Sequence, residues 1–280
     1  MSNKKKFKDL TIRDNFMFAA VMMYKDNCKR FLEMLLGIQI KQVDISYEKS
    51  LVFNPECKGI RLDVYANDEN NTRYDIEMQV ANQELGKRIR YYHSQMDMEL
   101  LESGHKYKEL PKTYVIFICN YDPFEREKYC YTFENRCVED LSLDLKDESI
   151  SIVLSTEGRN TDSIPKELKA FLDFVKEDTP KNDSKTEDVY VKQLQSSIRS
   201  VKENRKLERS FMSLEDVRDA ARIEGKQESV LTLLERIGEV PNNIKERIFL
   251  EHREDVLLEM LKDAATVTSF GEFEKLVSKV

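Results

Sequence analysis

Two short strand-like segments joined by a polar turn constrain the fold of this chain most strongly. They span residues 59–66 and 74–80, and apolar and polar side chains alternate along both. Because successive side chains of a strand point to opposite faces, each segment has one apolar and one polar face. Pairing the two segments as an antiparallel hairpin places Asp63 beside Glu77 on the polar face.

The polar face of this hairpin carries Asp63 from the first segment and Asp75, Glu77 and Gln79 from the second. Two carboxylates at one depth repel each other unless a cation lies between them. Hard oxygen ligands suit Mg²⁺ or Mn²⁺, so the pair predicts a divalent metal site. Taken alone, the hairpin favours a plainer interpretation, in which both carboxylates lie on a solvated outer face.

Composition limits the class of protein. The chain has 280 residues, enough for one sizeable domain and an accessory region, and its net charge of −7 disfavours a general nucleic-acid coat while permitting a local basic groove. The five cysteines show no CxxC spacing, which is typical of reduced thiols. No apolar run approaches the roughly 18 residues that span a bilayer, so we expect a cytoplasmic protein that contacts no membrane.

The order of the remaining elements predicts an α/β (α+β) fold with a mixed sheet flanked by helices. A segment of strand length at 113–119 is apolar throughout, as expected for a buried central strand. An amphipathic helix over 85–104 follows the hairpin, with apolar residues at helical spacing. The other expected helices cover 14–24, 27–36 and 166–176, and the other expected strands cover 43–53, 129–134 and 149–154.

A polar segment at 177–185 divides the main domain, residues 1–180, from a helical C-terminal region, residues 181–280. Helices are expected there at 189–209, 213–237 and 244–262, with Ser213 and Asp216 as a cap of the second. The amphipathic stretches of this region need an apolar surface to bury against. They therefore predict a homo-oligomer or a docking site for a partner, unless they pack on the main domain or on each other.

The hairpin and its neighbours together resemble the PD-(D/E)XK nuclease superfamily, and more narrowly its recombination-promoting nuclease and transposase branch. The resemblance covers roughly residues 7–160 and implies a restriction-endonuclease-like fold. With this surrounding pattern, the metal-site interpretation of the hairpin becomes the favoured one. The matching segments are 14–18 (DNFMF), 31–37 (FLEMLLG), 59–63 (GIRLD), 75–79 (DIEMQ), 88–92 (RIRYY) and 104–107 (GHKY).

The resemblance implies a metal-dependent DNA endonuclease, linked to DNA recombination or mobile elements, in which Asp63 and Glu77 bind Mg²⁺ or Mn²⁺. Gln79 completes the catalytic set and stands where the wider superfamily usually has lysine. A neutral amide can orient a water but supplies no positive charge, so catalysis would depend more on the metal, on Arg61 or on Arg88. Some members take a further acidic ligand from an early helix, and Glu33 is the candidate here.

The candidate DNA contacts lie on the hairpin and on the helix that follows it. Arg61 belongs to the first strand, and Arg88, Tyr91 and Gln95 share a helix face different from the buried stripe. With Arg90, they could contact backbone phosphates. The alternatives are plainer: the arginines form a solvated helix face, Tyr91 is a packing residue, and Glu33 is a surface carboxylate.

A second function remains open at this level. The amide at Gln79 and the acidic net charge are also compatible with a nuclease fold that has lost activity and serves as a DNA-binding or protein-interaction module. No second catalytic system and no helix-turn-helix pattern points to transposition itself.

Overall fold

The computed structural model describes residues 5–51, 59–101, 103–178 and 186–278. The chain forms two compact units. The first comprises Lys8–Asn204, and the second comprises Met1–Phe7 with Arg205–Val280. None of the described helices is long and apolar enough to cross a membrane.

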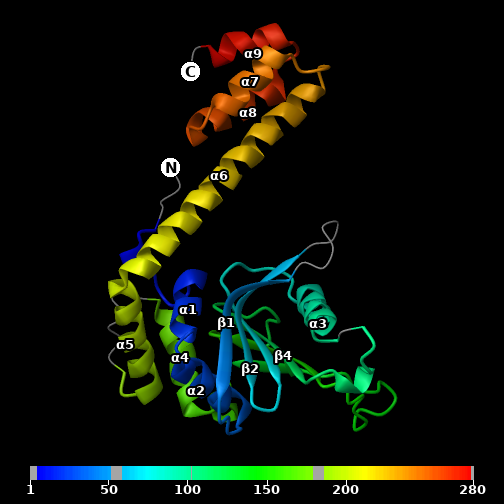
Figure 1. Cartoon of the computed structure of the whole chain (residues 1–280), viewed down its shortest axis with the longest axis vertical. Coiled ribbons are helices and arrows are strands. Elements are labelled where there is room, and N and C mark those ends of the chain that lie inside the picture. Colours follow the sequence, from blue (N-terminus) through cyan, green and yellow to red (C-terminus); the bar gives the residue numbers. More distant parts are fainter. Residues whose placement is uncertain (1–4, 52–58, 102, 179–185, 279–280) are drawn as a thin grey trace. The chain divides into compact units, whose positions relative to one another are not determined.

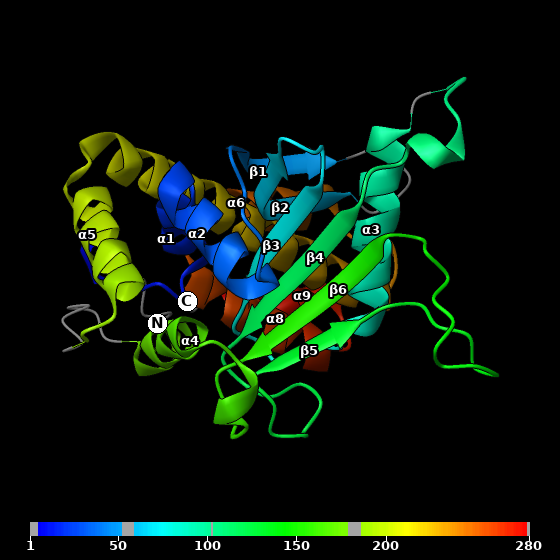
Figure 2. The ribbon, with the colours of Figure 1, turned by 90° about the horizontal axis from the view of Figure 1, so that it is seen from below.

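The first unit is built on a mixed sheet whose strands, within the described residues, follow the order β1-β2-β3-β4-β6-β5 (Figure 2). The pairs β1–β2, β2–β3 and β5–β6 are antiparallel, whereas β3–β4 and β4–β6 are parallel. The expected strand 43–53 is observed as far as Leu51, and residues 52–53 lie outside the described part of the chain. The strands are β1 (Val43–Leu51), β2 (Ile60–Asp68), β3 (Arg73–Gln79), β4 (Thr113–Cys119), β5 (Cys130–Phe133) and β6 (Ser149–Ser155).

Helices cover the two faces of this sheet unequally (Figures 1 and 2). On one side α1 (Asn15–Met22) and α2 (Lys25–Leu36) contact the first strands of the sheet. Two further helices, α4 (Lys166–Glu177) and α5 (Val189–Glu203), pack on α1 and α2. On the other side lies α3 (Gly86–Leu100). Because both faces are covered, every residue of the apolar strand β4 is buried, as its sequence predicts.

The side chains that attach α3 to the sheet are those of the predicted apolar stripe. Leu85, Ile89, Tyr92 and Met96 are buried in one cluster with residues of the sheet face beneath them. Because side chains alternate between the two faces along each strand, particular strand residues lie under this helix. They include Tyr65 of β2 and, on β4 and β6, Val115, Phe117, Cys119 and Val153.

Helix α5 belongs to the sheet unit, which runs to Asn204 and so extends past the boundary expected near residue 180. Tyr190 and Leu194 are fully buried, and the Tyr190 hydroxyl donates to the Asn27 carbonyl of α2 at 3.0 Å. The expected break between the helices near residue 210 is wrong. The chain breaks at Asn204 instead, which lies between α5 and α6.

The second unit consists of α6 (Arg205–Glu235), α7 (Asn242–Leu250), α8 (Glu254–Thr266) and α9 (Phe270–Val277). The predicted cap at Ser213 is wrong, because α6 is continuous through that residue. The predicted helix 244–262 is two helices, separated at 251–253.

The amphipathic stretches of α6 and α8 pack on each other, with Val230, Leu234 and Leu257 in one core, which is one of the alternatives that the sequence leaves open. Short 3₁₀ helices complete the chain at Phe7–Asp9, Tyr107–Glu109 and Thr161–Ser163.

The burial of Leu194 makes a prediction about the sheet unit. Leu194→Ala should lower the free energy of unfolding of this unit by about 2–5 kcal/mol, because it leaves a cavity between α5 and the helices beneath it. Lys192→Ala, on the exposed side of α5, is the control and should change it by less than about 1 kcal/mol. Hydrogen exchange of peptides from β4 measures the free energy of unfolding of the sheet unit directly. Equal protection in the two variants would contradict the packing of α5 described here.

Candidate active site

Strands β2 and β3 bring four polar side chains to the sheet face that α3 covers, and all four are buried. Asp63 is 6% exposed, Asp75 0%, Glu77 2% and Gln79 6%. The parallel register with β4 sets Glu77 beside Phe117, whose ring lies in the core under α3. The plainer interpretation of these carboxylates as a solvated outer face is therefore wrong, because the helix that follows the hairpin folds back over it.

The two strands separate where the carboxylates lie. The β2–β3 ladder runs from Asn67↔Arg73 to Val64↔Ile76. At the next position the Asp63 backbone N–H donates to Glu77 Oε1 at 2.9 Å. A side-chain carboxylate thus takes the place of a ladder carbonyl, and this bond holds Glu77 against Asp63.

Helix α3 contributes a guanidinium to the group. Arg88 Nη2 donates to Glu77 Oε2 at 2.7 Å, and Nη1 donates to Gln79 Oε1 at 2.7 Å. Arg88 Nε donates to the Tyr92 hydroxyl one turn along the helix, at 2.9 Å. The structure therefore joins Glu77, Gln79 and Arg88 in one hydrogen-bonded cluster, in which the Arg88 guanidinium bonds to β3 and its side chain stays 30% exposed.

Asn15 also belongs to the site, although no pattern in the sequence points to it as a functional residue. It is the first residue of α1, and its Nδ2 donates to Asp63 Oδ2 at 2.9 Å. The only sequence signal was its place in the DNFMF segment, at the start of a helix whose distance from Asp63 the sequence does not reveal. This bond fixes the orientation of the Asp63 carboxylate.

Burial controls the electrostatics of the carboxyl groups. It raises the pKa of Glu77 to about 8, and the charge of Asp63 adds to the shift, while the Asp63 N–H and Arg88 oppose it without cancelling it. Burial, followed by the charges of Glu77 and Asp63, raises the pKa of Asp75 well above its usual range. Neither oxygen of Asp75 has a hydrogen-bond partner among the described residues. Burial thus favours the protonated forms of both carboxyl groups.

The donor set suits a hard divalent cation. Asp63 and Glu77 supply carboxylate oxygens, and Mg²⁺ commonly keeps several waters and takes only one or two carboxylates from a protein. Within the described ranges, no group of three or more His, Cys, Asp or Glu side chains is placed to hold a metal. Two carboxylates therefore fit only an ion that keeps part of its water shell.

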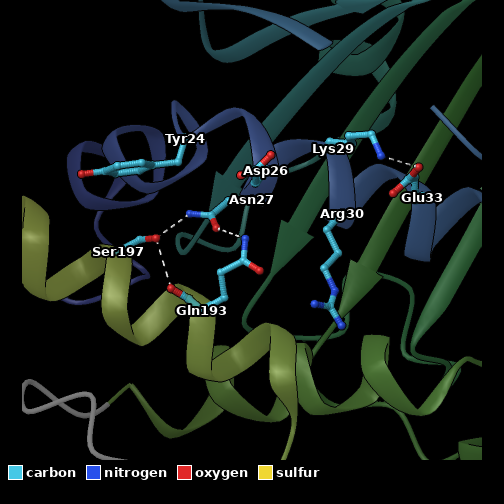
Figure 3. Close-up of a pocket in the computed structure, with 8 residues that line it drawn as sticks. All are labelled: Tyr24, Asp26, Asn27, Lys29, Arg30, Glu33, Gln193 and Ser197. Atoms are coloured by element: carbon cyan, nitrogen blue, oxygen red, sulfur yellow. Dashed lines mark hydrogen bonds and ion pairs between the residues drawn. The ribbon is translucent and has the colours of Figure 1, made fainter. Parts of the chain in front are cut away.

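The structure does not bring Glu33 to this site. Its carboxylate, on α2, accepts hydrogen bonds from Lys29 Nζ and from the Ile40 N–H, both at 2.9 Å. It lies instead along a separate pocket of about 530 Å³ between α2 and α5 (Figure 3). Helical spacing directs Glu33 to Lys29, four residues earlier, and to the turn that leads into β1.

The expected DNA contacts divide into exposed and buried side chains. Arg61 and Arg90 are exposed, as a phosphate contact requires. Tyr91 is half-buried and packs against the cluster under α3. Gln95 is only 7% exposed, so it lies less accessible than the two arginines, and its contact with DNA stays a prediction. Helical periodicity separated Gln95 from the apolar stripe, but the sheet covers a wider part of α3 than that stripe.

Comparisons with known proteins agree with this architecture. A family model described as PD-(D/E)XK nuclease family transposase matches residues 17–225, which include both strands of the hairpin, α3 and the whole of the sheet from β1 to β6. No curated protein and no solved structure matches the chain. On the extent of the family match, this chain belongs to the PD-(D/E)XK nuclease family transposases.

Proposed function

We propose that this protein is a divalent-metal-dependent endonuclease that hydrolyses DNA phosphodiester bonds in recombination or in the life of mobile elements. The observation that carries the proposal is the burial of Asp63 and Glu77 side by side where β2 and β3 separate. A buried carboxyl group with a raised pKa, as at Glu77, is typical of a functional site. Membership of the nuclease family supplies the substrate class.

In this proposal Asp63 and Glu77 hold Mg²⁺ or Mn²⁺. When bound, the metal lowers the pKa of a water ligand and offsets charge on the scissile phosphate. Asn15 keeps the Asp63 carboxylate in one orientation, and the Asp63 N–H does the same for Glu77. Such outer contacts preorganise the ligands, so less reorganisation is needed when the ion and the substrate arrive.

The remaining residues act on the nucleic acid and on the water. Gln79 is the polar side chain next along β3 on the same face, and it orients groups by hydrogen bonds without adding charge. Arg61 and Arg90 are exposed and contact backbone phosphates, which position DNA without reading its sequence.

A second function is favoured by one feature of the same site. Both oxygens of Glu77 accept hydrogen bonds within the protein, so the carboxylate has partners without any metal. A nuclease fold that binds DNA or protein without cutting would have this arrangement if Arg88 permanently replaced the ion. Metal binding distinguishes the two functions, because the inactive module is expected to bind no metal ion.

Cleavage of supercoiled plasmid tests the proposal. Purified protein should nick or linearise the plasmid with Mg²⁺ or Mn²⁺, and EDTA should abolish the reaction. Asp63→Asn and Glu77→Gln should each lower the rate by more than about 100-fold, because each removes a charged metal ligand. Asp44→Asn, on the exposed edge strand β1, is the matched control and should cleave normally. Cleavage that survives both substitutions would mean that the nuclease centre lies elsewhere.

The raised pKa of Glu77 predicts how metal affinity depends on pH. Below a pKa of about 8 the carboxyl group is protonated, and the metal must displace that proton. The association constant for Mn²⁺ should therefore rise by roughly tenfold per pH unit up to about pH 8 and then level off. Calorimetric titration from pH 6 to 9, in buffers of different ionisation enthalpy, measures both the affinity and the protons released. An affinity that is constant over this range would exclude a protonated Glu77.

The raised pKa of Glu77 also makes the stability of the metal-free protein depend on pH. The native state holds a proton on Glu77 that the unfolded chain releases above its ordinary pKa of 4.5. The free energy of unfolding should therefore fall as pH rises from about 5 to about 8. In Glu77→Gln this dependence should be weaker. Urea unfolding of both proteins at a series of pH values measures the difference, and parallel curves would contradict the shift.

A further inference from the structure

The guanidinium of Arg88 lies across two neighbouring polar positions of β3. It donates to Glu77 Oε2 and to Gln79 Oε1, both at 2.7 Å, and its third bond goes to the Tyr92 hydroxyl. A guanidinium has five N–H donors, so two remain beyond these three bonds. The Arg88 side chain is 30% exposed, so it is not sealed from solvent.

Aromatic rings hold this cation in place independently of its hydrogen bonds. The Arg88 guanidinium carbon lies 5.0 Å from the centre of the Tyr92 ring and 4.9 Å from that of the Phe117 ring. Both rings are buried, and a cation over an aromatic face is stabilised more strongly when it is shielded from water. Arg88 can therefore release one carboxylate oxygen and still remain in the site.

Gln79 is oriented so that it accepts from Arg88. Its Nε2 donates to the Ala81 carbonyl, which turns Oε1 toward the guanidinium. A neutral acceptor at this position allows the guanidinium to approach, whereas a cation there would repel it. The amide on β3 and the arginine on α3 are thus complementary, and the positive charge of the site comes from the helix.

We propose that Arg88 is a catalytic residue that supplies positive charge to the substrate phosphate, and that its bond to Glu77 would compete with a metal held by Asp63 and Glu77. The inference rests on the proposed nuclease function. Metal ion and guanidinium compete for one carboxylate oxygen. Arg88 N–H groups that are not bonded within the protein would then contact the phosphate, where charge develops during hydrolysis.

Metal binding without DNA tests the competition. Arg88→Gln removes the competing cation, so calorimetry should show Mn²⁺ binding about tenfold tighter than in the wild type. Lys87→Gln is the matched control, because Lys87 is an exposed neighbour that pairs with Glu84, and its affinity should be that of the wild type. Circular dichroism and urea unfolding establish that the variants fold. A folded Arg88→Gln with unchanged or weaker affinity would overturn the competition.

Plasmid cleavage tests the catalytic role. Arg88→Gln should cleave about 100-fold more slowly despite tighter metal binding, because it lacks the donor that acts on the developing charge. The double variant Gln79→Lys with Arg88→Gln returns a cation to the same cluster from β3, and should regain at least about tenfold over Arg88→Gln. Gln79→Lys alone places two cations side by side and should be impaired.

The outcomes separate this inference from the function on which it rests. If Arg88→Gln cleaves like the wild type while Asp63→Asn and Glu77→Gln are inactive, the nuclease function stands and the role of Arg88 is refuted. If the wild type cleaves no DNA with any metal, the nuclease function and the catalytic role fail together. In that case the calorimetric comparison still decides the competition for Glu77.

Discussion

The burial of two neighbouring carboxyl groups under a helix is the constraint on which the rest of the site depends. A buried charge is costly unless protein groups replace the water that it loses. Here those groups come from three elements: the Asp63 N–H of β2, Asn15 of α1 and Arg88 of α3. Because the three elements are remote in sequence, the carboxyl pair also ties the N-terminal helix, the hairpin and the following helix into one unit.

The charge balance of this cluster links stability to function. Burial favours the protonated forms of Asp75 and Glu77, and a divalent cation would favour the ionised ones. Arg88 provides part of the required positive charge in the metal-free protein, at a distance of 2.7 Å from Glu77. The bond from Arg88 to Glu77 therefore offsets part of the negative charge of the site within the protein itself.

The residues of the candidate site lie within one compact unit of the chain. Lys8–Asn204 contains the sheet, the carboxyl pair and α5, whose buried Tyr190 bonds to the α2 backbone. The family match continues to residue 225 and so includes the first part of α6. Helices α6 to α9 bury their apolar faces against each other, which removes the argument that those stretches require a second copy of the chain.

The sequence by itself determined the local features. Alternation along two strands is a property of the backbone, so it placed Asp63, Glu77 and Gln79 on one face, and helical spacing identified the stripe of α3. Only the tertiary structure decided what covers that face. The elements that pack above a side chain decide whether a carboxylate is solvated or buried. They also decide whether a helix residue such as Gln95 is exposed. Contacts between distant segments, such as Asn15 with Asp63, follow from packing that no local pattern encodes.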